Sequence, residues 1–335
     1  MQTEELDYEL PQAAIAQHPA EPRDSSRLLV DRGPGAWPEH RLTRDLPELV
    51  GPGDVLVVND SRVMPARLRL RKATGGRVEV LLLEPAADGW WSALVRPGRR
   101  VPPGTALWFE GAEVMAVGES AGADGRRWVR PAGDPHALMA RAGEVPLPPY
   151  LTGELNDPER YQTVYADRPV SAAAPTAGLH LTPAVLDRCR DAGADVRALE
   201  LAVGTATFTP VSAESLEDHA MHTEAYRIPE ATLAACAGAE RVVAVGTTVV
   251  RALEAAAATG SACACTDLFI KPPHRFAVVD AMLTNFHLPR SSLLALLAAF
   301  IGPRWRDLYG VALAEGYRFL SLGDAMFCNR DRRLA

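Results

Sequence analysis

The chain has 335 residues, of which 47% are hydrophobic and 23% are charged, and its formal net charge is −7. This length exceeds what one hydrophobic core usually supports, so we expect two domains in a globular protein of ordinary composition. The longest apolar run, Leu293 to Ile301, is too short to span a bilayer. The first residues show neither the basic nor the apolar region of a secretory signal. We therefore expect a cytoplasmic protein without a membrane partner.

The cysteines predict free thiols and no metal centre. Their number is odd, and none of them forms a C-x-x-C pair. Cys263 and Cys265 stand alone, without a second pair or a histidine at zinc-finger spacing. We expect all five thiols to be reduced in a reducing compartment.

The first strong structural signal is the apolar run Val55 to Val58, which follows the turn Pro52-Gly-Asp. A run of this length between turn residues predicts a strand that is buried on both faces. The polar cluster Asn59 to Arg62 follows it directly. Ligands of open α/β sheets collect beyond the carboxyl ends of strands, so this end of the strand is a candidate site.

From Pro65 to Pro149 the pattern changes to short β-prone segments that are separated by Gly and Pro turns. Evenly spaced short strands of this kind predict a small antiparallel barrel. Between Arg62 and Arg130 there are twelve Arg or Lys and seven Asp or Glu, a local charge of +5, which leaves −12 for the rest. A basic segment can bind a phosphate backbone. On charge alone, a solvated basic face without a partner remains an alternative.

The stretch Ser171 to Leu186 combines small residues with groups that can do chemistry, Thr176 and His180. Small residues let a ligand approach the backbone closely, and Gly178 can take a positive φ at no steric cost. Thr182-Pro183 reads as a helix N-cap and first turn. The alternative is a tightly packed loop whose histidine is structural.

The remainder alternates strand, loop and helix. We expect a helix over Pro183–Ala192, a strand over Val196–Val203, a strand and helix around Gly246, and a strand before Asn285. This alternation predicts an α/β fold with a mostly parallel sheet and helices on both faces, interrupted by the inserted barrel. The predicted domains are an α/β domain of residues 1–64 and 150–335 and a barrel domain of residues 65–149.

Three polar groups follow the predicted strands. Gly246-Thr-Thr lies at a helix N-terminus, where backbone N–H groups favour anionic or hydroxyl-rich ligands, and the alternative is a plain capped turn. One turn later, Arg251 can bind a carboxylate or phosphate, or it can pair with Glu254. Thr284 to His287 supplies an amide and an imidazole at a strand end.

Other known motifs do not fit. His219, His222 and Glu224 lie close in sequence, but their spacing matches neither an H-E-x-x-H helix nor a zinc finger, so a metal is not expected. The chain has no G-x-G-x-x-G after a predicted strand and no G-x-S-x-G. Asp324, near the C-terminus, adds a carboxylate beside a glycine.

Read together, these stretches resemble the S-adenosylmethionine:tRNA ribosyltransferase-isomerases of queuosine biosynthesis over almost the whole chain. The motifs that carry the resemblance include Arg23-Asp-Ser-Ser-Arg, Gly53-Asp-Val-Leu-Val-Val-Asn, Arg62-Val-Met-Pro-Ala-Arg-Leu, Arg160-Tyr-Gln-Thr-Val-Tyr-Ala, Ala173-Ala-Pro-Thr-Ala-Gly-Leu-His, His219-Ala-Met-His-Thr-Glu, Ala244-Val-Gly-Thr-Thr, Leu283-Thr-Asn-Phe-His-Leu-Pro and Gly323-Asp-Ala-Met.

The resemblance implies that S-adenosylmethionine is a ribosyl donor and co-substrate, with no prosthetic group and no metal. The acceptor is 7-aminomethyl-7-deazaguanine at the tRNA wobble position, and the products are epoxyqueuosine in tRNA, adenine and methionine. Two alternatives remain: a paralogue that uses the same donor on another acceptor, and a non-catalytic RNA-binding protein. We expect a monomer.

The resemblance also suggests roles for particular residues. His180 or His287 is the expected base, and Asp280 or Asp324 is expected to stabilise the sulfonium or the amine. The predicted substrate-binding residues are Thr176, Gly178, Thr247, Thr248, Arg251, Asn285, His222 and Glu224, with Arg251 on the methionine carboxylate. The predicted tRNA phosphate contacts are Arg67, Arg69, Arg71, Lys72, Arg99 and Arg100.

The chain departs from the family pattern at several positions. Ala202 stands where the family usually has a histidine, and Ala206-Thr-Phe where it has Gly-Thr-Phe. Lys271-Pro-Pro replaces Tyr-Pro-Gly, Leu181 replaces a phenylalanine, and Met326-Phe-Cys replaces Met-Leu-Ile. The first two departures lie on one segment and bear most directly on the acceptor and on activity.

Overall fold

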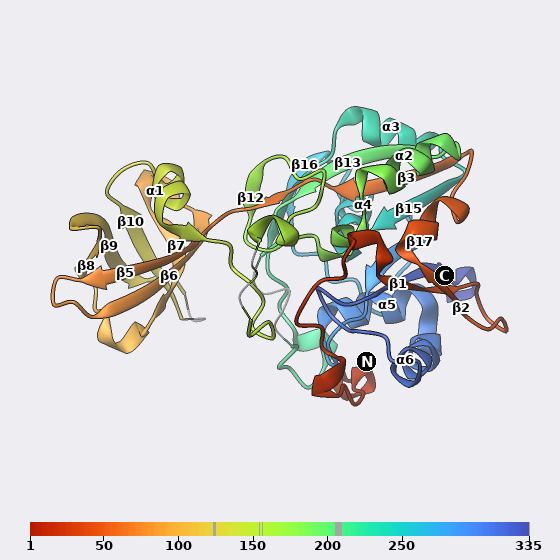
Figure 1. Cartoon of the computed structure of the whole chain (residues 1–335), viewed down its shortest axis with the longest axis horizontal. Helices are drawn as coiled ribbons and strands as arrows, with labels where there is room; N and C mark the ends of the chain where they lie inside the picture. Colours follow the sequence, from red (N-terminus) through yellow and green to blue (C-terminus); the bar gives the residue numbers. More distant parts are fainter. Residues whose placement is uncertain (123–124, 154, 156, 205–209, 335) are drawn as a thin grey trace. The chain divides into compact units, whose positions relative to one another are not determined.

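The computed structural model describes residues 1–122, 125–153, 155, 157–204 and 210–334. The chain divides into two compact units (Figure 1). The α/β unit contains Met1–Arg62, Pro149–Arg168 and Ala174–Ala335, and the barrel unit contains Val63–Pro148 and Pro169–Ala173. Each unit is considered by itself.

The α/β unit is built on a nine-stranded sheet. Its strands, in spatial order, are β16 (Cys263–Thr266), β14 (Glu224–Arg227), β13 (Asp195–Leu201), β3 (Asp54–Asn59), β15 (Arg241–Val245), β17 (Ala281–Asn285), β18 (Ala325–Asn329), β1 (Arg27–Asp31) and β2 (Glu39–Leu42).

The predicted fold class is confirmed, although the sheet is mixed and not mostly parallel. One parallel group contains β13, β3, β15 and β17, in this order, and β18 and β1 form a separate parallel pair. The pairs β17–β18, β1–β2, β13–β14 and β14–β16 are antiparallel. Two of these antiparallel pairs, β1–β2 and β13–β14, join strands that follow each other along the chain. These two pairs therefore do not need the crossover connection that parallel pairing requires.

Two of the helices begin at hydroxyl caps, one of which is the Thr182 cap that the sequence predicts. The hydroxyl of Thr182 accepts a hydrogen bond from the Val185 N–H, and the hydroxyl of Ser291 accepts one from the Leu294 N–H. The α-helices of this unit are α2 (Pro183–Asp191), α3 (Glu230–Gly238), α4 (Thr247–Thr259), α5 (Ser292–Ile301) and α6 (Trp305–Ala314). No helix within the described residues is long and apolar enough to span a membrane.

The central strands are buried on both faces, as their continuous apolar runs predict. On one face, Leu56, Val58 and Leu283 pack with Val185 and Leu186 of α2. The alternate residues of the same strands point to the other face, because successive side chains of a strand alternate. Helices α3 and α4 contact β3 and β13, and α5 contacts β18.

The parallel group brings four strand ends to one edge of the sheet. Asn59, Leu201, Val245 and Asn285 are the last residues of β3, β13, β15 and β17. The Asn59 amide joins two of these ends, since it donates to the Leu201 carbonyl at 3.0 Å and accepts from the Leu201 N–H at 3.1 Å. The groups that follow β15 and β17 therefore meet at this edge.

The barrel unit contains a closed antiparallel barrel. Six strands follow the order β5-β6-β7-β10-β9-β8, and a β5–β8 pairing closes the ring. Leu68, Leu70, Val80 and Met115 lie in its core. Its elements are β5 (Arg67–Lys72), β6 (Arg77–Pro85), β7 (Trp91–Arg96), β8 (Ala106–Phe109), β9 (Ala112–Ser120), β10 (Arg126–Pro131), α1 (Pro135–Ala142) and β11 (Gly143–Glu144). Two short strands, β4 (Arg62–Val63) and β12 (Pro169–Ser171), pair separately.

Candidate active site

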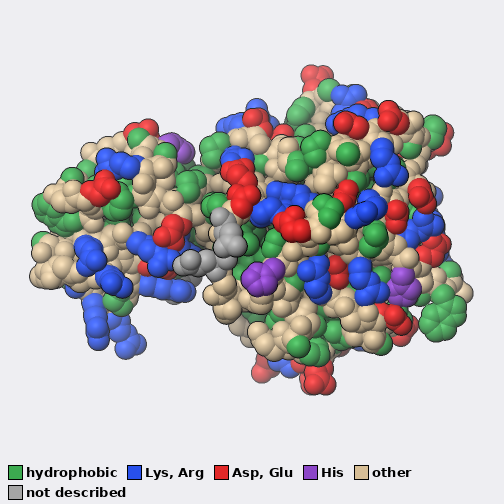
Figure 2. All heavy atoms as spheres, in the orientation of Figure 1, with side chains coloured by type: hydrophobic (Ala, Val, Ile, Leu, Met, Phe, Trp, Pro, Cys, Tyr) green, Lys and Arg blue, Asp and Glu red, His purple; other side chains and the backbone are tan. Residues whose placement is uncertain are grey.

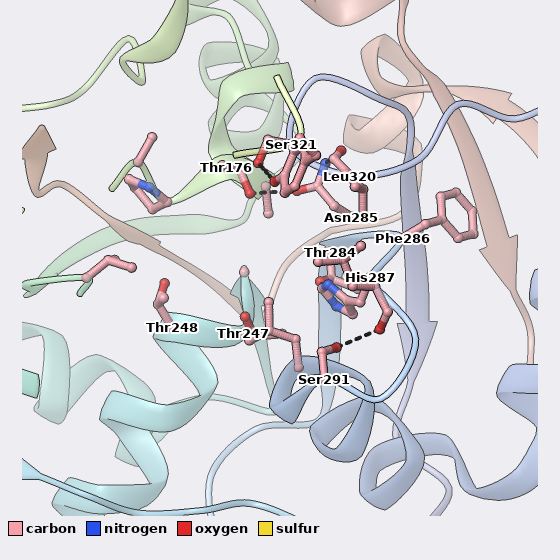
Figure 3. A pocket seen from close by; sticks show the side chains of 18 residues that line it. Thr176, Thr247, Thr248, Thr284, Asn285, Phe286, His287, Ser291, Leu320 and Ser321 are labelled. Carbon is pink, nitrogen blue, oxygen red and sulfur yellow. Dashed lines mark hydrogen bonds between the residues drawn. The ribbon is translucent and has the colours of Figure 1, made fainter. Parts of the chain in front are cut away.

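A narrow cavity of about 50 Å³, which we call the slot, lies at the carboxyl edge of the α/β sheet (Figure 3). Among the described residues that line it there is no Asp, Glu, Lys or Arg. The polar residues that line it are Tyr150, Thr176, Thr247, Thr248, Thr284, Asn285, His287, Ser291 and Ser321. The slot thus offers hydroxyl, amide and imidazole groups, which suit a neutral polar ligand.

The turn between β15 and α4 forms one wall of the slot. Gly246 has φ +97°, a conformation that favours glycine, and Thr247 and Thr248 open the helix directly after it (Figure 3). At the start of a helix the first backbone N–H groups lack intrahelical partners. The predicted Gly246-Thr-Thr motif therefore does lie beside a cavity.

The opposite wall is organised by the Asn285 side chain at the end of β17. Its oxygen accepts from the Thr176 hydroxyl at 3.2 Å, and its nitrogen lies 3.2 Å from the Leu320 carbonyl and 2.9 Å from Nε2 of His180. A carbonyl only accepts hydrogen bonds, so the NH₂ group must face Leu320. Its second N–H then donates to Nε2 of His180.

This contact determines the protonation state and the tautomer of His180. An Nε2 that accepts a hydrogen bond carries no proton, so the ring is neutral and its proton is on Nδ1. Burial lowers the pKa of His180 to about 4. His180 is 4% exposed and is not among the residues that line the slot.

His287, by contrast, lines the slot directly. Its Nε2 lies 3.1 Å from the Thr284 hydroxyl, and its backbone N–H donates to the Tyr309 hydroxyl at 2.9 Å. Burial lowers the pKa of His287 to about 3, so the ring is neutral at physiological pH. Of the two histidines predicted as bases, His287 is therefore the one with access to a ligand in the slot.

Close packing explains why position 178 is a glycine. Gly178 lies in η8 (Thr176–His180) and does not use the positive φ that is open to a glycine. A Cβ at this position would lie 2.0 Å from the Tyr165 hydroxyl and 2.9 Å from Cγ2 of Thr163. Close packing behind the slot excludes any side chain here, and Gly178 supports the slot from behind.

A second cavity of about 320 Å³, which we call the chamber, shares Thr247, Thr248 and Leu293 with the slot. Unlike the slot, it is lined by ionisable groups. These are Asp218, His219, His222, Glu224 and Arg251, which lie among apolar residues such as Met221, Phe269 and Leu296. The two cavities together form one cleft with a neutral end and a charged end.

Arg251 is held by several partners at the chamber wall. Its guanidinium forms an ion pair with Glu224 and also donates to the backbone carbonyls of His222, Thr266 and Leu268. Glu224 in turn accepts from the Gly204 N–H at 2.8 Å. The predicted alternative, a pair with Glu254, is not formed.

Glu254 has its own partners. It accepts hydrogen bonds from the N–H groups of Ala277, Val278 and Val279, and these bonds together with His274 lower its pKa. This buried carboxylate anchors the segment that leads into β17.

The structure does not bring Asp280 or Asp324 into the cleft. Asp280 precedes β17 at the opposite end from Asn285, where it accepts from the Val242 N–H and pairs with Arg330 and Arg332. Asp324 is 2% exposed and accepts from the N–H groups of Arg27 and Arg318. Neither carboxylate is among the described residues that line the slot or the chamber, and each is held by these partners.

No cluster that could hold a metal is found among the described residues. His219 and His222 both line the chamber, and burial together with the neighbouring His222 lowers the pKa of His219. The Glu224 carboxylate, the third member of the sequence cluster, is occupied by Arg251 and the Gly204 N–H.

Tyr150, Ser321 and Asp218 are among the residues that line the cleft and that sequence reasoning missed. The signal for Asp218 was present, because it directly precedes the His219 cluster. Tyr150 and Ser321 are 171 positions apart, and their hydroxyls lie 2.5 Å from each other. No local pattern could have paired them.

Two departures from the family pattern fall near the chamber. Lys271 pairs with Glu217 and donates to the Leu216 carbonyl at 3.1 Å, so it holds η10 (Leu216–Asp218), which carries Asp218. Ala202 continues the β13–β14 pairing through its N–H, which donates to the Ala225 carbonyl. The segment Ala206-Thr-Phe lies outside the described residues.

The barrel unit carries the predicted basic residues along one edge. On β5, Leu68 and Leu70 point into the core, while Arg69 and Arg71 are exposed between and beyond them. Arg99 and Arg100 are exposed on η6 (Gly98–Arg100), and Lys72 donates to the Arg100 carbonyl at 3.1 Å. Figure 2 shows Lys and Arg side chains gathered along the lower edge of this unit.

Four of the predicted residues have protein partners, and two further basic residues were missed. Arg71 donates to the Gly75 carbonyl, and Lys72 donates to the Arg100 carbonyl. Arg69 pairs with Glu144 at 2.8 Å, and Arg67 is partly buried with a contact to the Leu147 carbonyl. Exposed Arg77 lies directly opposite Arg71, and exposed Arg96 ends β7. We call Arg71, Lys72, Arg77, Arg96, Arg99 and Arg100 the basic face.

The fold and cleft define an α/β protein with an inserted barrel and a polar site at the carboxyl edge of its sheet. The family model described as "Queuosine biosynthesis protein" matches residues 3–328. The chain belongs to this family.

Named relatives agree with this assignment. S-adenosylmethionine:tRNA ribosyltransferase-isomerase from Thermus thermophilus is 52% identical, with 96% of this chain and 98% of the relative covered. The protein of the same name from Rubrobacter xylanophilus is 51% identical, with 97% of each covered. The crystal structure of S-adenosylmethionine tRNA ribosyltransferase from Thermotoga maritima has a TM-score of 0.55 and 36% identity, with 97% of this chain and 99% of that chain covered.

Proposed function

We propose that this chain is an enzyme that transfers and isomerises the ribosyl group of S-adenosylmethionine. The acceptor is the aminomethyl nitrogen of 7-aminomethyl-7-deazaguanine at the tRNA wobble position, and the products are epoxyqueuosine in tRNA, adenine and methionine. The relatives, about half identical over nearly the whole chain, support this function over a paralogue or a non-catalytic RNA-binding protein. The single structural observation that carries it is the cleft with a neutral hydroxyl-lined end and a charged end.

The two ends of the cleft match the two parts of the donor. Its sugar is neutral and rich in hydroxyls, which suits the slot, where Thr176, Thr247, Thr248 and Asn285 offer hydrogen bonds. The slot has room for roughly four waters, which is close to the size of a pentose ring. Its amino-acid end carries an ammonium and a carboxylate, which suit the chamber.

Within the chamber, Asp218 and Arg251 are the groups that would receive the charges of the amino acid. Four of the five N–H groups of Arg251 make described hydrogen bonds, one to Glu224 and three to backbone carbonyls. These bonds hold the guanidinium at the chamber wall. Asp218 is therefore assigned the role predicted for Asp280 and Asp324, which is to stabilise a positive charge of the donor. His222 contributes its backbone carbonyl to the Arg251 site.

The reaction needs a base for the C5′ proton beside the sulfonium, and we assign it to His287. The ring lines the slot and is neutral at physiological pH, so one of its two nitrogens carries no proton. His180 has its Nε2 occupied by Asn285 and lies behind the lining residues. We therefore assign His180 a positioning role that acts through Asn285.

The basic face of the barrel unit is the proposed contact for tRNA phosphates. Its exposed arginines, together with half-buried Lys72, carry positive charge that can displace counterions from the backbone. These contacts position an RNA without reading its sequence. A solvated face without a partner is the competing explanation.

The function is tested by mixing purified protein, S-adenosylmethionine and tRNA that bears 7-aminomethyl-7-deazaguanine. We expect release of adenine and methionine in equal amounts and a matching mass gain of the nucleoside, measured by liquid chromatography and mass spectrometry. The same tRNA with guanine at the wobble position is the control and should give none of these. Donor binding without turnover would favour another acceptor, and absence of donor binding would favour a non-catalytic protein.

The roles of the two histidines are separable in the same assay. We expect His287→Ala to lower kcat for adenine release by about 10²- to 10⁴-fold, because a general base contributes this much. His180→Ala should act mainly on the KM for the donor, since its effect passes through Asn285. If both variants release adenine like the wild type, or if His180→Ala has the larger effect on kcat, the assignment of His287 is wrong.

Charge reversal tests the basic face. Arg71→Glu combined with Arg77→Glu should weaken tRNA binding and reduce the slope of log Kd against log salt by about two, one for each phosphate that is no longer neutralised. Arg141→Glu on α1, where Arg141 is 57% exposed, reverses one charge elsewhere on the unit and should leave the slope unchanged. An unchanged slope in the double variant would place the tRNA elsewhere.

A further inference from the structure

One lysine of the α/β unit connects two walls of the chamber. Lys271 follows the lining residues Phe269 and Ile270, and its ammonium reaches η10 on the other wall. It donates to the Leu216 carbonyl at 3.1 Å and forms an ion pair with Glu217, and its side chain is only 20% exposed. We call these two contacts the clamp. Because Glu217 is 64% exposed, its ion pair contributes little alone, and the bond to the carbonyl is the main part of the clamp.

The clamp joins two wall segments that carry different lining residues. One wall is η10 with the residues that follow it, which supply Asp218 and His219, and the other wall supplies Phe269. The Lys271 ammonium lies 5.3 Å from the centroid of the Phe269 ring, a distance at which a cation is attracted to an aromatic face. The His219 ring meets the Phe269 ring at its edge, with 5.4 Å between their centroids. Lys271 therefore contacts both walls.

The direction of the Asp218 carboxylate depends on where η10 is held. Asp218 is exposed and lines the chamber, and no hydrogen bond or ion pair to its carboxylate is found within the described part of the chain. Its N–H donates to the Ser215 carbonyl at 3.1 Å, so its backbone belongs to the turn. The Leu216 peptide holds this turn from both sides, because its N–H donates to the Met1 carbonyl and its carbonyl accepts from Lys271.

We propose that Lys271 is a positioning residue that holds Asp218 where the ammonium of the donor's amino acid binds. A carboxylate complements an ammonium, and a hydrogen bond between two charged groups depends on their geometry. Glu217 neutralises the charge of Lys271, so the clamp adds no net charge to the chamber wall. The role of Asp218 rests on the proposed function, whereas the clamp rests on the contacts of Lys271.

The test removes the clamp without changing the net charge. The clamp variant combines Lys271→Met with Glu217→Gln, and its Kd for S-adenosylmethionine is measured by calorimetry without tRNA. We expect it to bind the donor about tenfold more weakly than the wild type, the worth of a weak charged hydrogen bond. A deaminated donor, in which hydrogen replaces the α-amino group, should bind to the wild type and to the clamp variant with the same Kd.

A double-mutant cycle separates positioning from a general loss of structure. Asp218→Asn should weaken donor binding by about tenfold or more, and adding the clamp variant should then change Kd by less than about twofold. If the two effects multiply, or if the clamp variant weakens both donors equally, Lys271 does not act through Asp218 and the inference is wrong. If the wild type binds both donors equally, the ammonium lies elsewhere, and the inference fails while the proposed function stands. If the wild type binds no donor, the proposed function fails too.

A matched control removes a comparable ion pair at the opposite edge of the sheet from β16. Arg41 on β2 is 28% exposed and pairs with Glu48. Arg41→Met combined with Glu48→Gln should bind both donors like the wild type. Weaker donor binding by this control would show that loss of any such ion pair has the same effect, and it would overturn the inference.

Discussion

The hydrogen bonds of the Asn285 amide hold the candidate active site together. This one side chain joins η8 through Thr176 and His180 to β17 and to the turn at Leu320. These segments are far apart in the chain, so the geometry of the slot exists only when all of them are in place. An amide can serve because it accepts at one end and donates twice at the other.

The same constraint explains how a site with two histidines stays uncharged. Protonation of His180 would bring an N–H against the Asn285 N–H, and burial without an acidic partner in the slot opposes a charge on His287. A neutral slot next to a charged chamber can bind the neutral sugar of the donor at one end and its charged amino-acid group at the other. Thr247 and Thr248, which line both cavities, lie where these parts would meet.

The sequence allowed much of the fold and part of the site to be predicted. Buried apolar runs, the Thr182 cap and the Gly and Pro turns of the barrel are local signals, and they identified the elements. The slot residues Thr247, Asn285 and His287 were found because each follows a strand at the same sheet edge. The ion-pair partners of the charged side chains could not be predicted from such local signals. Arg251 pairs with Glu224, and Asp280 with Arg330, because the topology brings distant segments together.

The protonation state and tautomer of His180 test most directly whether the Asn285 amide organises the slot in this way. In ¹⁵N NMR of the histidine side chains, assigned with the His180→Asn variant, the ring should remain neutral with its proton on Nδ1 from pH 8 down to about pH 5. This follows from a pKa of about 4 and from the N–H that Asn285 donates to Nε2. A ring that protonates near pH 6.5, or one that carries its proton on Nε2, would contradict the account.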